Sequence, residues 1–227
     1  MSADLSIVGF TALLALVSTL LLVPPGIAIA WWLSRPGQRG VKAIVETLVT
    51  LPLVLPPTAV GLLLLEALST HAPLGRALDS MGIELVFTWK AVVLATFVMS
   101  APLLIRSVRT AFEELDERLL GVARTLGAKP LRVFFRIALP LAWRGVVAGT
   151  LLSFCRALGE FGATILIAGN IPGRTQTLAL AIFQRAQIGE DGAALRLVAI
   201  AVALAFIVVL ASELLLRAPA RVKRSAR

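Results

Sequence analysis

The sequence contains few of the residues that usually build an active site. Its 227 residues include one cysteine, one histidine and no tyrosine, and only 15% are charged. The single Cys155 and the single His71 exclude an intrachain disulfide and a metal site made of Cys and His clusters. The Gly-x4-Gly-Lys-Ser/Thr loop that holds ATP phosphates is absent, as are a Ser-His-Asp set and a His-Glu-x-x-His motif. We therefore expect no catalytic residue, no metal and no bound cofactor in this chain.

The chain is instead rich in long apolar runs. Hydrophobic residues make up 58% of it, and its mean hydropathy is +0.91. Soluble domains are about half apolar and about a quarter charged. Several runs are long enough to cross about 30 Å of hydrocarbon as helices. We predict an all-α, polytopic membrane protein forming one domain, 1–227. The five predicted spans cover residues 7–33, 45–68, 87–105, 137–158 and 195–216.

The stretch 159–192 does not fit a sixth span. Its apolar part, Phe161–Gly169, is too short, and the turn sequence Asn170–Gly173 follows it. We expect a broken or re-entrant segment here, which a membrane protein tolerates where the backbone is buried or faces a wet cavity.

Basic residues predict the orientation of the bundle. The net charge is +9, and three regions that share one side of a five-span bundle hold most of the basic residues. Cytoplasmic segments of membrane proteins carry such an excess, so the N-terminus should lie outside and the C-terminus inside. The charge thus indicates contact with a bilayer and not with nucleic acid. The basic residues concerned are Arg35, Arg39 and Lys42, then Arg106, Arg109, Arg118, Arg124, Lys129, Arg132 and Arg136, and finally Arg217, Arg221, Lys223, Arg224 and Arg227.

The inside loop 106–136 should contain a short amphipathic helix. Apolar residues at helical spacing share one face, namely Leu115, Leu119, Val122 and Leu126. Asp116 suits the N-cap, Gly127 suits the C′ position, and Pro130 follows. Such a helix could dock a soluble partner, or it could lie on the lipid headgroups.

Several motifs resemble those of one transporter family. Gly127 is followed after nine residues by Ile137–Pro140, Ile-Ala-Leu-Pro, which is similar to the EAA loop of ABC importer permeases. The chain departs from that pattern at Gly121, where the family has Glu, and at Val122, where it has Ala. Further stretches resemble the molybdate permeases of bacterial ABC importers: Leu51–Gly61, Arg124–Ala128, Arg156–Thr164 and Asn170–Gly173.

The resemblance implies a type I ABC importer permease fold with a cytoplasmic coupling helix. It also implies an inner-membrane homodimer with a periplasmic N-terminus, two cytoplasmic ATPase subunits that bind ATP and Mg, and a periplasmic oxyanion-binding protein. The residues expected to dock the ATPase are Asp116, Leu119, Val122, Ala123, Arg124, Leu126 and Gly127.

A tetrahedral dianion needs a polar path, because an unpaired charge in hydrocarbon is very costly. Candidates for the path or its gate are Pro56, Pro57, Thr58, Ser153, Arg156, Glu160 and Thr164. Proline can break a helix that lines a transport site, or it can merely kink one for packing. Arg156 and Glu160, four residues apart, can pair on one helix face. Each hydroxyl could instead bond to its own helix.

Three alternatives to molybdate transport stay open on the sequence alone, and the third of them is a membrane enzyme. The anion could be sulfate, thiosulfate or tungstate. In a different class of function, the chain could be a membrane scaffold whose basic loop recruits a soluble partner. A scaffold would not need the proline-broken second span or the charged Arg156–Glu160 region.

Overall fold

The computed structural model describes residues 2–216, and all regular structure in that part of the chain is helical. The predicted all-α fold is confirmed. The helices are α1 Ser2–Ser34, α2 Arg39–Val54, α3 Pro57–Leu68, α4 Pro73–Ser80, α5 Trp89–Glu113, α6 Glu117–Thr125, α7 Pro130–Val133, the π-helix η1 Phe134–Ala138, α8 Leu139–Leu141, α9 Trp143–Leu158, α10 Gly162–Ile167, α11 Leu178–Gln187 and α12 Asp191–Leu216. The basic residues predicted to mark an inside tail, Arg217 to Arg227, lie outside the described residues.

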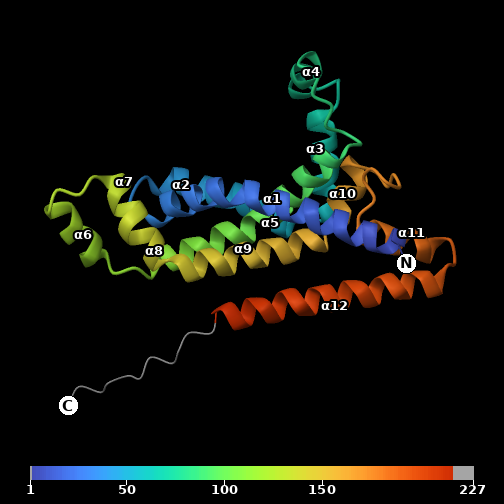
Figure 1. The fold of residues 1–227 in the computed structure, drawn as a ribbon. Coiled ribbons are helices and arrows are strands. Elements are labelled where there is room, and N and C mark those ends of the chain that lie inside the picture. The colour runs from blue at the N-terminus through green and yellow to red at the C-terminus, as the bar shows by residue number, and fades with distance from the viewer. Residues whose placement is uncertain (1, 217–227) are drawn as a thin grey trace.

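Helices α1, α5 and α9 form the centre of the molecule (Figure 1). α5 is the most buried of them, with buried side chains recurring along it from Ala91 to Phe112. α9 approaches α5 closely at Gly145, where a Cβ atom would lie 2.2 Å from Ala111 Cβ. α5 also extends beyond the predicted end of its span at 105, so residues 106–113 of the inside loop continue the helix.

Two of the predicted spans are bent. Among the described residues, α1, α5 and α12 are each long and apolar enough to cross a membrane, and two bent pairs bring the number to five if each pair is one span. The pair α2–α3 turns by 116°, and the segment Pro130–Leu141 meets α9 at 72°. The first bend lies at Leu55 and Pro56, where proline has no N–H for a helix and Pro57 begins α3. The topology of five crossings remains a prediction.

The proline break places α3 against α10. In Figure 1, α3 leaves the bundle at a steep angle, with α4 beyond it and α10 beside its base. The two helices approach closely because each contributes a glycine, Gly61 of α3 and Gly162 of α10, at a point of contact. A Cβ on Gly61 would lie 2.7 Å from Ala163 Cα, and one on Gly162 would lie 2.7 Å from Pro57 Cβ. The glycines therefore fix the distance between α3 and α10.

We expect Gly61→Ala to destabilise the protein although alanine favours helices. The new methyl would meet backbone atoms of Ala163, which cannot rotate away. Overpacking of this kind typically costs about 1–3 kcal/mol. Thermal unfolding in detergent should show a lower midpoint than for Gly9→Ala, a matched control in α1 whose Cβ would have no neighbour within 4 Å. Equal midpoints for the two variants would contradict the close contact.

Candidate coupling and gate sites

The predicted amphipathic helix is α6, and its two ends have the predicted caps. The Asp116 side chain accepts a hydrogen bond from the Arg118 amide at 2.8 Å. At the other end Gly127 has φ +80°, in the left-handed region. The next amide, of Ala128, donates to the Ala123 carbonyl at 3.0 Å, which closes a Schellman motif. α6 is thus a defined nine-residue helix with sharp ends.

The two faces of α6 differ in burial. Leu120 is 2% exposed and anchors the helix to the core, and Ala123 packs against the same core cluster. The apolar stripe on the opposite face is open, with Leu119 54% exposed, Val122 58% and Leu126 82%. Figure 1 places α6 at one tip of the molecule, beyond the ends of the long helices. We call Leu119, Val122 and Leu126 the exposed stripe.

An aromatic cluster holds both ends of the segment that carries α6. Phe112 precedes the segment, Phe134 follows it, and both rings pack on Trp31 of α1, with centroids 5.0 and 5.2 Å away. Phe112 is fully buried. The chain therefore enters and leaves the α6 segment at one cluster that joins α1, α5 and η1.

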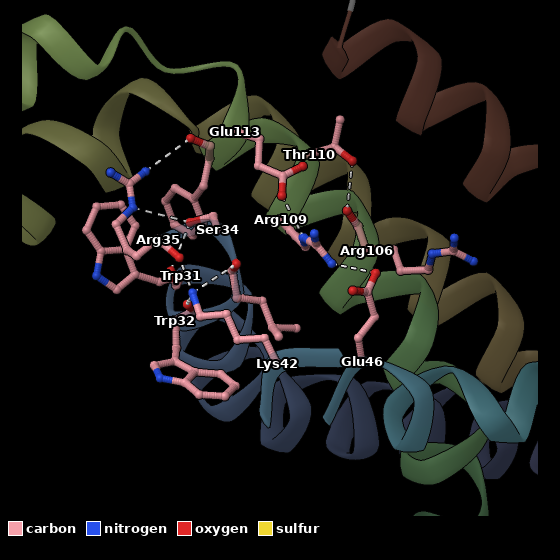
Figure 2. A network of polar contacts seen from close by, with 12 residues as sticks. Trp31, Trp32, Ser34, Arg35, Lys42, Glu46, Arg106, Arg109, Thr110 and Glu113 are labelled. Carbon is pink, nitrogen blue, oxygen red and sulfur yellow. Dashed lines mark hydrogen bonds and ion pairs between the residues drawn. The ribbon is translucent and has the colours of Figure 1, made fainter. Parts of the chain in front are cut away.

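Arg35 lies beside Trp31 of the aromatic cluster (Figure 2). Its guanidinium lies 4.1 Å from the centre of the Trp31 ring, and it donates a hydrogen bond to the Phe112 carbonyl at 3.3 Å. Burial lowers the pKa of Arg35, and the nearby Arg124 lowers it further, whereas Glu117 acts in the opposite direction. Arg35 thus lies in the electrostatic field of α6 without a close ion pair to it.

The connection from α6 to the far end of the molecule runs through α9. After the π-helix η1 and the short α8, the chain turns at Ala142 and continues as α9 to Leu158. Single π-helical turns are frequent at functional sites. α9 ends next to α10, away from α6 (Figure 1). One helix therefore joins the region of the exposed stripe to the Arg156–Glu160 region.

Glu160 is a buried carboxylate between α9 and α10. Its side chain is fully inaccessible and forms an ion pair with Arg156, Oε2 to Nη1, at 2.7 Å. Its other oxygen, Oε1, accepts the Ala163 amide at 2.8 Å, near the first turn of α10. The predicted pair of Arg156 and Glu160 is therefore present, but the two residues do not share a helix face, because α9 ends at Leu158 and Glu160 follows it. Because Ala163 also touches Gly61, Glu160 fixes the start of the helix that supports α3.

The other predicted path residues divide into two groups. Pro56, Pro57 and Thr58 are exposed at the break before α3, and Pro57 is the neighbour of Gly162. Thr164 is fully buried in α10, and its hydroxyl has no hydrogen-bond partner among the described residues. Ser153 is buried between α9 and α5, where its hydroxyl donates to the Ser100 carbonyl at 3.2 Å. The structure therefore brings all of these residues except Ser153 around the α3–α10 contact.

Sequence reasoning missed the polar contacts that hold α2. No residue of α2 is buried, yet Lys42 Nζ donates to the Trp32 carbonyl at 2.6 Å and to the Arg35 carbonyl at the end of α1. Glu46 pairs with Arg109 of α5 at 2.5 Å, and Arg109 also pairs with Glu113 (Figure 2). The four-residue spacing of Lys42 and Glu46 signals one face of α2, but their partners are distant in the sequence.

Comparison with protein families and curated proteins gives extensive matches. Residues 22–221 match the family described as "Binding-protein-dependent transport system inner membrane component". The chain is 48% identical over 204 residues to the molybdenum transport system permease protein ModB of Escherichia coli K12, covering 88% of each chain. It is 41% identical over 212 residues to ModB of Haemophilus influenzae, covering 92% of each.

Solved structures share the fold at low sequence identity. The inward-facing MetNI methionine ABC transporter superposes with a TM-score of 0.74 at 19% identity, with 96% of both chains covered. A bacterial alginate ABC transporter, solved with a periplasmic protein bound to an alginate pentasaccharide, superposes with a TM-score of 0.73 at 18% identity. That match covers 96% of this chain and 79% of the other.

Proposed function

Since the chain belongs to the inner membrane components of binding-protein-dependent transport systems, we propose that it is the permease subunit of an ATP-driven molybdate importer. Two copies would form the translocation path in the bacterial inner membrane, with the N-terminus periplasmic and the C-terminus cytoplasmic. Two cytoplasmic ATPase subunits would bind ATP and Mg and hydrolyse the ATP. A periplasmic oxyanion-binding protein would deliver the substrate.

One observation carries the proposal: α9 connects the region of an exposed apolar helix to a buried ion pair. The exposed stripe of α6 presents three large apolar side chains to the solvent at one tip of the molecule. The Arg156–Glu160 pair lies at the other end of α9, against the α3–α10 contact. A soluble subunit that covers the stripe could therefore act on a site that it never touches.

Mechanically, closure of the ATPase dimer would displace α6. The aromatic cluster of Trp31, Phe112 and Phe134 would pass that displacement to α1, α5 and η1. α9 would then shift α10. α3 would move with α10, because the two helices are already in contact at Gly61 and Gly162. Movement at the proline break would bring Thr58, which is already exposed, and the adjacent backbone to the path of the anion.

The charges near the path suit transient passage of an anion. Arg156 is paired with Glu160, so it offers no bare cation that would trap a dianion. Neutral hydroxyl donors such as Thr58 and Thr164 bind anions weakly, and conduction requires weak binding. We assign Arg156 and Glu160 to the gate and not to direct ligation of the substrate.

Molybdate is the proposed substrate because the Escherichia coli and Haemophilus influenzae relatives are named as molybdenum transport permeases. The test is ATP hydrolysis by the permease and its ATPase in nanodiscs, with binding protein loaded with molybdate, tungstate or sulfate. We expect the molybdate-loaded protein to stimulate hydrolysis several-fold more than the sulfate-loaded protein. Stimulation by sulfate alone would reassign the substrate, and a lack of stimulation by any anion would favour a scaffold.

A further inference from the structure

A crevice separates the inner face of α6 from the end of α1. Its volume is about 270 Å³. It is lined by Arg35, Pro36, Glu117, Leu120, Gly121 and Arg124. On α6 these residues lie on the face opposite the exposed stripe, so the crevice passes behind the helix proposed to dock the ATPase.

The charges in the crevice are incompletely paired. Two guanidinium groups face it and only one carboxylate, that of Glu117. Among the described ion pairs, none joins Glu117 to Arg35 or Arg124. Arg35 uses Nη2 for the Phe112 carbonyl and Nε for the Ser34 hydroxyl, and its Nη1 has no hydrogen bond among those described. The crevice therefore has a net positive charge and free donors.

Gly121 leaves room for a further group between these charges. A Cβ at this position would have no neighbouring atom within 4 Å, so the space is not filled by another part of the described chain. The backbone of α6 does not need glycine here, because Gly121 is not among the residues with positive φ. What the glycine provides is an open volume beside Arg35 and Arg124.

We propose that this crevice receives an aspartate or glutamate side chain of the ATPase subunit that docks on α6. The inference rests on the proposed function. Charge complementarity selects the occupant, because a carboxylate can accept two parallel hydrogen bonds from a guanidinium. Position selects the partner: α6 carries the stripe on one face and lines the crevice with the opposite face, so a subunit that surrounds this short helix would reach both.

The test is the affinity of the ATPase subunit for the permease in nanodiscs, measured at low and high salt. We expect Arg35→Gln/Arg124→Gln to raise the dissociation constant by roughly 10-fold or more at low salt and to flatten its salt dependence. The matched control, Arg39→Gln/Arg132→Gln, removes the same charge from exposed positions outside the crevice. It should change the affinity by less than about threefold.

A second variant avoids any disturbance of the aromatic cluster beneath Arg35. Gly121→Glu places a carboxylate of the permease itself in the crevice, so it should exclude the partner's carboxylate and weaken binding. Wild-type affinity in this variant would overturn the proposal, as would equal behaviour of the two double variants. If either of these contradicting results appeared while Leu126→Asp still lost binding, the crevice proposal would be wrong and the docking role of α6 would stand. If Leu126→Asp also bound normally, the docking function of α6 would fail too.

Anionic lipid is the competing occupant, and the same measurement distinguishes it. In nanodiscs made only of zwitterionic lipid, the effect of Arg35→Gln/Arg124→Gln should persist. Its disappearance there would assign the crevice to a headgroup phosphate and overturn the protein contact.

Discussion

Leu126→Asp should abolish productive docking of the ATPase while leaving the permease folded. Leu126 is 82% exposed, the most open position of the stripe, so the substitution removes no core contact. Burial of a leucine side chain contributes about 1.5–3 kcal/mol. Its loss should raise the dissociation constant of the ATPase by roughly 10- to 150-fold. ATP hydrolysis stimulated by loaded binding protein, recorded in nanodiscs, should fall accordingly.

The matched control is Thr125→Asp, which adds the same charge one residue earlier, outside the stripe. Thr125 is also exposed, and its hydroxyl donates to the Val122 carbonyl of its own helix. It should keep most of the stimulated hydrolysis. Wild-type assembly and hydrolysis in Leu126→Asp would rule out α6 as the docking element. An equal loss in both variants would indicate a general effect of negative charge.

Glu160→Gln should impair transport more than any other conservative change near the α3–α10 contact. Glutamine keeps an oxygen that can accept the Ala163 amide, but it leaves Arg156 without its counter-charge. Removing one partner of a buried ion pair typically costs about 3–5 kcal/mol. Arg156 is 27% exposed, so water will offset part of that cost. We expect ATP-driven uptake into proteoliposomes to fall by at least roughly 10-fold.

The double variant Arg156→Gln/Glu160→Gln separates the ion pair from the cap on α10. It removes the unpaired cation, so it should recover part of the uptake lost in Glu160→Gln. A gate role also predicts that more ATP is hydrolysed per anion transported in Glu160→Gln, a ratio that simple loss of folded protein would not change. Normal uptake with normal stimulated hydrolysis in Glu160→Gln would show that the pair is not part of a gate.

Local sequence signals predicted the elements that depend on local chemistry. The cap at Asp116, the left-handed Gly127 and the pairing of Arg156 with Glu160 each involve residues within a few positions of one another. The break at Pro56 is only partly local. Proline favours a kink or a break, but Pro24 and Pro25 lie inside α1, Pro52 inside α2 and Pro102 inside α5, so the presence of proline alone does not predict which helix ends. The apolar runs, which are a local signal, predicted an all-α membrane protein.

Contacts between distant segments could not be read from the sequence. Nothing in the sequence spacing of Glu46 and Arg109 indicates that their side chains pair, and nothing in the spacing of Trp31 and Phe134 indicates that their rings pack together. The size of the bend at Leu55 depends on packing against α10, which only the tertiary structure supplies. The sequence analysis made Ser153 a candidate for the anion path. In the structure its hydroxyl instead donates a hydrogen bond to the Ser100 carbonyl of α5, a contact between distant segments.

The most direct test of the transport assignment is uptake of molybdate by proteoliposomes that contain the permease and its ATPase, with binding protein outside and ATP inside. The account predicts uptake that requires both ATP and binding protein, and that is lost in Leu126→Asp although the permease remains folded. Uptake that continues without ATP, or an assembled complex that hydrolyses ATP in response to loaded binding protein yet accumulates no molybdate, would contradict it.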